Sequence, residues 1–178
     1  MQSAHRMFAN TCAACHGADG RGGAGFPDLS DRDWLYGGDI ETIQASILQG
    51  RTGMMPAFGR FLSNDEIKSL TQYVMSMSGN SARANKEDQD SVTAGKALYQ
   101  RQCVACHNAD GSGNTILGAA NLNDDIWLHG GDERSIYRTI RFGKTNRMPP
   151  HKHLISEQQS RLLTAYVLNS QQQSDDTL

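Results

Sequence analysis

The residues with the clearest chemical potential are four cysteines and the histidines that follow them. All the cysteines of the 178-residue chain lie in two motifs, Cys12-Ala13-Ala14-Cys15-His16 and Cys103-Val104-Ala105-Cys106-His107. C-x-x-C-H is the attachment motif of haem c. Two thiols add to the two vinyl groups of the porphyrin, and the adjacent histidine lies under the iron as an axial ligand. We therefore interpret both motifs as sites of covalent haem attachment, which predicts two haems.

Two other uses of paired cysteines fit the sequence less well. A zinc site made of four cysteines would leave both histidines unexplained. A thioredoxin-like dithiol would follow a β-strand, and no strand pattern precedes either motif. Because no cysteine is left over, the pattern favours haem.

Composition and charge are consistent with a cofactor-filled protein. Hydrophobic residues make up 38% of the chain and aromatic residues 7%, a thin core for two domains of about 80–90 residues. A large apolar cofactor would fill such an interior. The net charge of -2 gives no reason to expect a nucleic-acid partner. No apolar run approaches the roughly 18 residues of a membrane span, and no leader pattern begins the chain, so we expect this stretch to be soluble.

The two halves of the chain are repeats of one another. The cysteine motifs match at an offset of 91 residues, and residues 34–39 match residues 127–132 at an offset of 93. The second half therefore carries two extra residues in the loop after its motif. We predict a first domain over 1–79, a linker over 80–92, a second domain over 93–170 and a flexible tail over 171–178.

The repeat also selects a second axial ligand for each iron. Met55 matches Met148 and both precede a proline, whereas Met54 matches Arg147. Proline fixes the local backbone, which suits a rigid loop that holds a thioether on iron. We therefore predict Met55 and Met148 as ligands. The alternative is that a methionine simply packs in the core. We assign that role to the methionines in helical patterns, which are Met7, Met75 and Met77.

Helical periodicity and capping residues predict an all-α fold with long loops. Glycine-rich loops over 15–39 and 106–132 are expected to wrap the haems, and we expect no strand. Ser63 and Glu66 form a capping-box pattern, as do Ser156 and Gln159. The other expected helices span residues 3–15, 39–49, 93–106 and 132–142.

Each half resembles class I cytochrome c, and more narrowly the di-haem subunit of cbb3-type cytochrome c oxidases, the CcoP/FixP family. The "W-L-x-G-G" stretch in both halves is more specific than C-x-x-C-H alone. The segments that carry the resemblance are residues 8–17, 25–29, 33–38, 55–59, 121–131 and 139–143.

The resemblance implies a role in respiration. We expect two His/Met-ligated haems to relay single electrons from a donor cytochrome c to the catalytic subunit, with no catalysis in this chain itself. It also implies membrane-bound oxidase subunits as partners and a periplasmic location. Family members usually carry an N-terminal anchor, so we expect the native chain to be anchored and this stretch to be a fragment.

Residues around the ligands follow from the same resemblance. In cytochromes c, a loop proline carbonyl commonly accepts a hydrogen bond from the proximal histidine, a role that Pro27 fits for His16. Ala120 replaces that proline in the second half, so we expect a less rigid pocket there. Apart from the resemblance, we expect Trp34 and Trp127 to pack on a haem or its propionates rather than to carry electrons. Arg138 and Arg141 are expected to face haem propionates, with a docking partner as the alternative.

Alternatives remain at the level of both site and function. His151 and His153 follow Met148 and are potential competitors for iron, although surface histidines of this kind are usually bystanders. The second half has a basic stretch over 134–152, whereas the matching stretch of the first half contains only two basic residues, both arginines. This difference in charge would let the two halves dock to different partners. The rival functions are a free-standing di-haem carrier, a di-haem peroxidase and a gas sensor.

Overall fold

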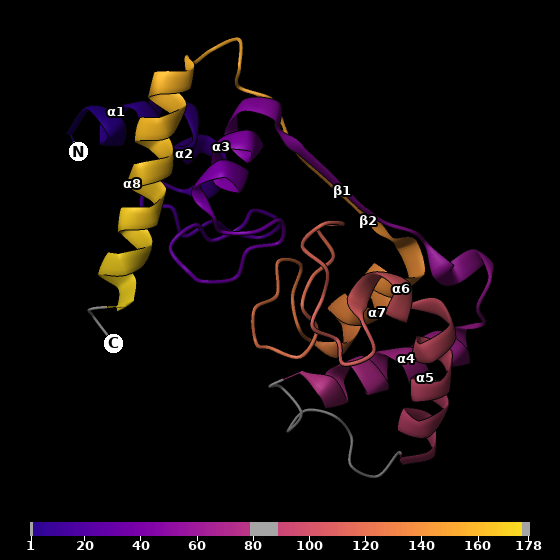
Figure 1. The fold of residues 1–178 in the computed structure, drawn as a ribbon. Coiled ribbons are helices and arrows are strands. Elements are labelled where there is room, and N and C mark those ends of the chain that lie inside the picture. The colour runs from indigo at the N-terminus through magenta and orange to yellow at the C-terminus, as the bar shows by residue number, and fades with distance from the viewer. Residues whose placement is uncertain (1, 79–88, 176–178) are drawn as a thin grey trace. The chain divides into compact units, whose positions relative to one another are not determined.

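The computed structural model describes residues 2–78 and 89–175, which form helices joined by long loops (Figure 1). The first half of the chain contributes α1 (Gln2–Thr11), α2 (Ala13–His16), α3 (Ile40–Gln49), β1 (Arg51–Met55), the 3₁₀ turn η1 (Phe58–Arg60) and α4 (Asn64–Met77). The second half contributes α5 (Gln89–Gln102), α6 (Val104–His107), α7 (Glu133–Phe142), β2 (Lys144–Met148) and α8 (Glu157–Asp175). The expected all-α class is confirmed.

Helix starts lie where the capping residues predict them. Asp39 caps α3 and Asp132 caps α7, each by accepting a hydrogen bond from a backbone N–H of the first turn. Both capping boxes form: the Ser63 hydroxyl accepts from the Glu66 N–H, and the Glu66 carboxylate accepts from the Ser63 N–H. Ser156 and Gln159 make the same reciprocal pair at α8.

Other helix boundaries differ from expectation. A turn at Cys12 separates α1 from α2, and the same turn at Cys103 separates α5 from α6, where single helices were expected. α5 begins at Gln89, so the last residues of the expected linker are helical, and residues 79–88 lie outside the described part of the chain. α8 continues to Asp175, which covers most of the expected tail; residues 176–178 are not described.

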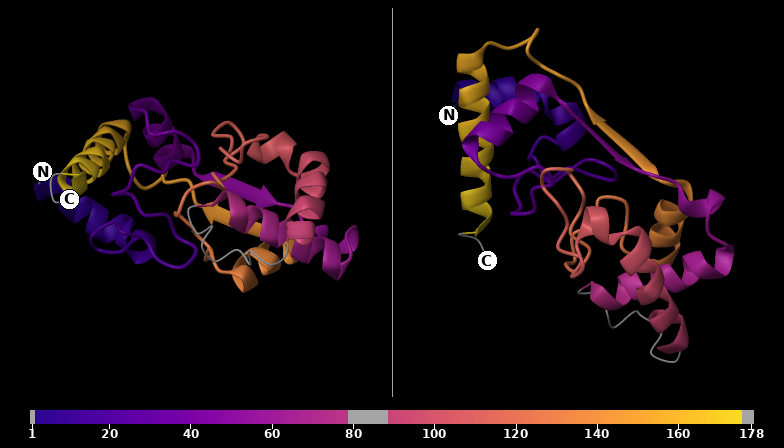
Figure 2. Two further views of the ribbon diagram at one scale, coloured as in Figure 1. Left: turned by 90° about the horizontal axis from the view of Figure 1, so that it is seen from below. Right: turned by 45° about the vertical axis from the view of Figure 1, so that its right-hand side comes forward.

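The expectation that the chain contains no strand is wrong. β1 and β2 pair in a two-stranded sheet and run side by side in the views of Figures 1 and 2. They escaped sequence analysis because neither alternates apolar and polar residues. Gly50 lies against Met148–Pro149, and Gly143 lies against Met55–Pro56, so the strands are antiparallel.

The chain divides into two compact units that differ from the contiguous halves expected. Unit 1 contains Met1–Thr52 and Asn146–Leu178, and unit 2 contains Gly53–Thr145. Each unit therefore combines the motif and first helices of one repeat with the methionine and closing helix of the other. Because the repeats are similar, the exchanged segments replace one another in equivalent positions.

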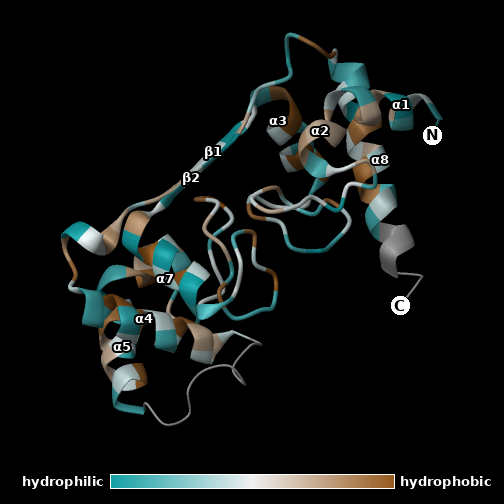
Figure 3. Cartoon of the chain, turned by 180° about the vertical axis from the view of Figure 1, so that it is seen from behind, coloured by the Kyte–Doolittle hydropathy of each residue, from teal (hydrophilic) through white to brown (hydrophobic). Residues whose placement is uncertain are grey.

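Unit 1 is closed by α8, which packs against α1 and α3 (Figure 1). Its core is formed by Phe8, Ile43, Ile47, Ile155, Leu163 and Val167. The Phe8 and Tyr166 rings lie 5.2 Å apart. Both hydrophobic and hydrophilic residues occur along α3 and α8 (Figure 3), and the two buried residues of α3, Ile43 and Ile47, are one turn apart.

Unit 2 is closed by α4, which packs against α5 and α7. Its core is formed by Ile67, Leu70, Val74, Met75, Leu98, Tyr99, Ile136 and Ile140. The Tyr73 and Tyr99 rings meet edge to face at 5.3 Å. In the described part of the chain, no helix is both long and apolar enough to cross a membrane.

Candidate haem sites

The histidine of each C-x-x-C-H motif is oriented by a backbone carbonyl of the following loop. His16 Nδ1 donates to the Pro27 carbonyl at 3.0 Å, and His107 Nδ1 donates to the Ala120 carbonyl at 2.9 Å. Because a carbonyl only accepts, Nδ1 carries the proton and the lone pair is on Nε2. This is the tautomer that binds iron through Nε2. Burial lowers the pKa of His107, which also favours the neutral imidazole.

The four cysteines form no disulfide, and their surroundings do not suit a redox dithiol. Burial raises the pKa of Cys12, and burial together with the nearby Cys106 side chain raises the pKa of Cys103 to about 11. Catalytic dithiols need a lowered thiol pKa. In each motif one cysteine is half-buried and the other, Cys15 or Cys106, is exposed, so both thiols stay accessible for attachment.

Met55 and Met148 both lie in the hydrophobic clusters that contain a C-x-x-C-H motif. Met148 packs in the cluster of unit 1, which includes Cys12, and Met55 packs in the cluster of unit 2, which includes Cys103. Met54 is 77% exposed, because side chains along β1 alternate between the two faces. The neighbouring methionine is therefore not available to the same cluster. The structure thus brings each motif together with the methionine of the other repeat.

The tryptophans of the two W-L-x-G-G stretches border the same clusters. Trp34 packs in unit 1 and Trp127 in unit 2. A Cβ at Gly131 would lie 2.5 Å from Trp127 Cδ1, so the last glycine of the stretch makes room for the indole. Trp127 Nε1 is buried and has no hydrogen-bond partner among the described residues. An orphaned donor of this kind fits a haem propionate, which would supply the missing acceptor.

The two expected arginine partners of propionates differ in their surroundings. Arg141 donates to Tyr137 and to Asn64 at the start of α4. Arg138, on the same helix α7, is exposed. Within the described contacts, Arg141 thus ties α7 to α4 and Arg138 stays open to solvent.

The two histidines after Met148 lie at the turn that leads into α8. The backbone N–H of His151 donates to the Ile47 carbonyl at 3.1 Å, which fixes the turn against α3. Its side-chain Nδ1 is buried and unpaired within the described residues. His153 is exposed. His151 therefore has a structural role that sequence analysis missed, because a long-range backbone hydrogen bond leaves no signal in the sequence.

The two extra residues of the second half fall within one loop. Gly23 bridges to Phe26 in the first half, and Asn114 bridges to Ala119 in the second. The longer loop exposes Ile116, whose side chain is 90% accessible.

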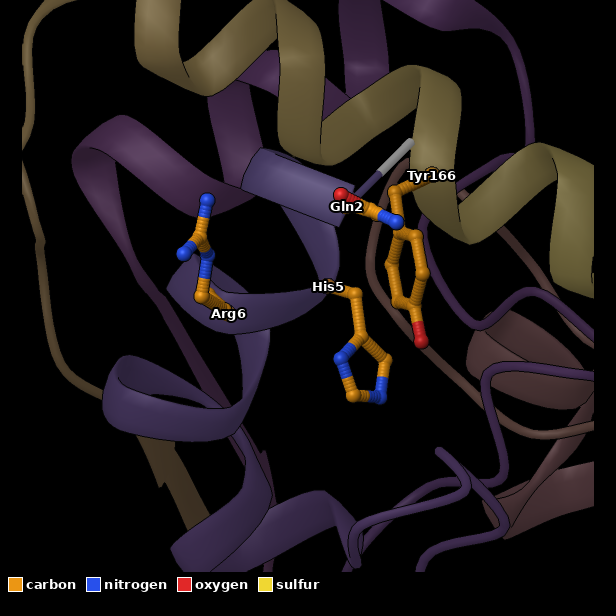
Figure 4. A pocket seen from close by; sticks show the side chains of 4 residues that line it. All are labelled: Gln2, His5, Arg6 and Tyr166. Carbon is orange, nitrogen blue, oxygen red and sulfur yellow. The ribbon is translucent and has the colours of Figure 1, made fainter.

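A separate pocket of ≈ 440 Å³ lies between α1 and α8 and contains none of the candidate ligands (Figure 4). Its lining residues are Gln2, His5, Arg6 and Tyr166. The His5 and Tyr166 rings meet edge to face at 6.0 Å.

Comparison with known proteins points to a single family. The family model described as "Cytochrome C oxidase, cbb3-type, subunit III" matches residues 1–74 and 90–167. A CcoP subunit of a cbb3-type cytochrome c oxidase from Rubrivivax gelatinosus is 43% identical over 98% of this chain and 56% of its own length. A FixP subunit from Azorhizobium caulinodans is 40% identical over 90% of this chain and 56% of its own length. A CcoP subunit from Cereibacter sphaeroides is 34% identical over 90% of this chain and 58% of its own length.

The fold and the motifs define a c-type cytochrome, a class that carries covalently bound haem c. The chain belongs to the family of subunit III of cbb3-type cytochrome c oxidases, an electron-transport component. It spans a little over half the length of the curated relatives described above.

Proposed function

We propose that this chain relays single electrons from a donor cytochrome c to the catalytic subunit of a cbb3-type oxidase. Two haems, one on each C-x-x-C-H motif, would supply the one-electron redox chemistry when bound. One observation carries the proposal: in each compact unit the Nδ1 of the motif histidine is held by a carbonyl, and a half-buried methionine packs in the hydrophobic cluster that includes the first cysteine of the motif.

The chain's own residues account for the properties of such a carrier. His16 and His107 would hold the iron through Nε2, and the Pro27 and Ala120 carbonyls keep the rings in place. A methionine thioether would serve as a second ligand and keep water away, which favours ferrous iron and a raised potential. The buried Trp127 Nε1–H has no acceptor among the described residues and would donate to a propionate.

The setting of the proposed relay follows from the relatives and from haem chemistry. The relatives are named as subunits of cbb3-type oxidases, which makes other oxidase subunits the expected partners here. Haem c is attached outside the bacterial cytoplasm, so we place the folded units on the periplasmic side. An anchoring segment in the native chain would keep them at the membrane.

Haem content and ligand exchange test the proposal. We expect two haems per purified chain, a ferric charge-transfer band of Met-ligated iron, and no carbon monoxide adduct on the reduced protein. One haem per chain would contradict the proposed pair of redox centres. Carbon monoxide binding at one iron would favour a gas sensor, and turnover of peroxide would favour a peroxidase.

The relay itself needs a kinetic measurement in the assembled oxidase. Within the complex, we expect the reduced donor to reduce both haems of this chain before oxygen is consumed. Reduction of the catalytic subunit while this chain stays oxidised would exclude the relay.

A further inference from the structure

We infer that each haem takes its axial methionine from the opposite repeat, an inference that rests on the proposed function. Met148 would bind the haem on Cys12 and Cys15, and Met55 the haem on Cys103 and Cys106. The sequence alone favours the contiguous pairing, because each methionine follows the motif of its own repeat. The observations below favour the exchanged pairing.

The first observation is the path of the chain after the middle helices. From Gly50 the backbone continues into β1 and carries Met55 into unit 2. A Cβ at Gly50 would lie 2.4 Å from the Met148 carbonyl oxygen, and one at Gly143 would lie 2.5 Å from that of Met55. The end of each middle helix therefore lies directly against the methionine loop of the other repeat.

The second observation is a close helix crossing at Gly95. A Cβ at this position of α5 would lie 2.0 Å from the Ser69 carbonyl oxygen of α4. The repeat equivalent of Gly95 is Ala4, at the offset of 91. In a contiguous first domain, Ala4 would have to pack against Ser69, and its methyl group would not fit at this separation. The α4–α5 contact is thus specific to the exchanged arrangement.

The third observation is a polar pair between α3 and α8. Gln44 donates its side-chain amide to the Ser160 hydroxyl at 3.0 Å, and Ser160 is fully buried. The repeat equivalent of Ser160 is Ile67, which is also fully buried. A contiguous first domain would place the Gln44 amide against Ile67 and leave it without this acceptor, at the cost of an unpaired polar group.

One pair would gain from the contiguous arrangement. Arg141 now donates to Asn64, whose repeat equivalent is Glu157, so a contiguous second domain would offer Arg141 a carboxylate. Asn64 and Glu157 are both exposed, and an exposed ion pair contributes little. The contacts of Gly95 and Gln44 therefore stabilise the exchanged arrangement by more than an Arg141–Glu157 ion pair would stabilise the contiguous one.

Single-haem proteins separate the two pairings. Replacing Cys103 and Cys106 by alanine leaves only the haem of the first motif, and Met55→Ala and Met148→Ala are then introduced one at a time. We expect Met148→Ala to abolish the charge-transfer band of Met-ligated ferric haem and Met55→Ala to leave it intact. With Cys12 and Cys15 replaced instead, we expect the effects of the two variants to be reversed.

The outcomes distinguish this inference from the proposed function. Loss of the band on replacing the methionine of the same repeat would overturn the exchanged pairing but retain His/Met ligation. If neither single-haem parent shows the band, the proposed ligation itself fails, and the exchanged pairing with it.

A second measurement applies if a single-haem chain does not fold. In the reduced two-haem protein, an iron-bound methionine methyl group gives an upfield-shifted resonance from the ring current. Met55→Ala removes one of these resonances. We expect the remaining Met148 methyl to show nuclear Overhauser contacts to Trp34 and Leu29, which share its cluster. Contacts to Trp127 and Leu122 would overturn the inference.

Discussion

At the scale of the residue, the second site has one polar atom that its protein surroundings leave unpaired. Trp127 Nε1 is buried without a described partner, whereas both motif histidines are held by carbonyls. A propionate at this position would be partly neutralised by the indole N–H. The tryptophan would then affect the redox potential as well as packing.

Trp127→Phe tests this role while keeping an aromatic ring. Without the donor, the propionate charge favours ferric iron more strongly, so we expect a lower midpoint potential for one haem. A redox difference of up to about 1.4 kcal/mol corresponds to a shift of up to about 59 mV for one electron. An optical redox titration measures it.

Trp34→Phe is the matched control, because it changes the equivalent residue of the other unit. We expect it to leave the potential affected by Trp127→Phe unchanged. If Trp127→Phe shifts neither potential, the indole is a packing residue only.

The candidate ligands could be predicted from the sequence, but which methionine lies in the same unit as which C-x-x-C-H motif could not. C-x-x-C-H defines its own chemistry, and the duplication separates Met55 from Met54 by matching only the former to a methionine. The 77% exposure of Met54 agrees with that choice. The unpaired Nε1 of Trp127 depends on what surrounds the ring in three dimensions, which no local pattern encodes.

At the scale of the element, the close approach of α5 to α4 depends on Gly95. In a helix interior, Gly→Ala usually stabilises by about 1 kcal/mol. Here a methyl group would overlap the Ser69 carbonyl oxygen, so we expect Gly95→Ala to destabilise the protein by about 1–3 kcal/mol, as overpacking does. Urea unfolding followed by circular dichroism measures the change.

Gly23→Ala is the control for Gly95→Ala. A Cβ at Gly23 would meet no atom within 4 Å, so we expect little change in the free energy of unfolding. Equal effects of the two substitutions would show that the α4–α5 crossing is not close-packed.

The N-cap of α7 predicts a pH dependence. Hydrogen bonds from Ser135 lower the pKa of Asp132 below its ordinary value of 3.8. A carboxyl with a lowered folded-state pKa stabilises the protein above its unfolded-state pKa, and this contribution is lost as the pH falls through the folded-state pKa. Asn caps helices without titrating. We therefore expect Asp132→Asn to be less stable than the parent at neutral pH and the difference to shrink below about pH 4.

Urea midpoints measured from pH 7 to pH 3 check this prediction. Ser78→Ala is a suitable control, since it removes a hydroxyl at the end of α4 that does not titrate. A gap between Asp132→Asn and the parent that stays constant over this range would show that the cap carries no charge-dependent stability.

Helix starts were predictable because their signals are local. Asp39, Ser63, Asp132 and Ser156 all cap helices as the sequence indicates. β1 and β2 were not predictable, since each strand has the other as its partner and neither has an alternating pattern. The start of α5 at Gln89, within a polar and charged stretch, was missed for lack of an apolar periodicity.

At the scale of the whole molecule, each compact unit is built from segments of both repeats. Sequence similarity between the halves revealed the duplication but could not reveal the exchange, because either arrangement uses equivalent helices in equivalent positions. What differs is a few side chains at the crossings, such as Gly95 in place of Ala4. Their effect appears only when the helices are packed.

The exchange predicts the behaviour of a chain cut between the repeats. A protease site inserted between residues 84 and 85 would cut the chain into two pieces. Each compact unit would then contain segments of both pieces. We expect the cut pieces to elute together in native gel filtration and to separate in urea, because buried helix contacts hold them. Separation of the pieces without denaturant would indicate contiguous domains.

The reciprocal exchange of methionine loops also bears on how the two copies evolve. After duplication, two contiguous domains would each remain complete, and either could be lost or replaced. With the inferred pairing, deleting one copy would remove the closing helix and the thioether from the other site. Because β1 and β2 carry each half of the chain into the other unit, we expect both halves of the gene to be retained together.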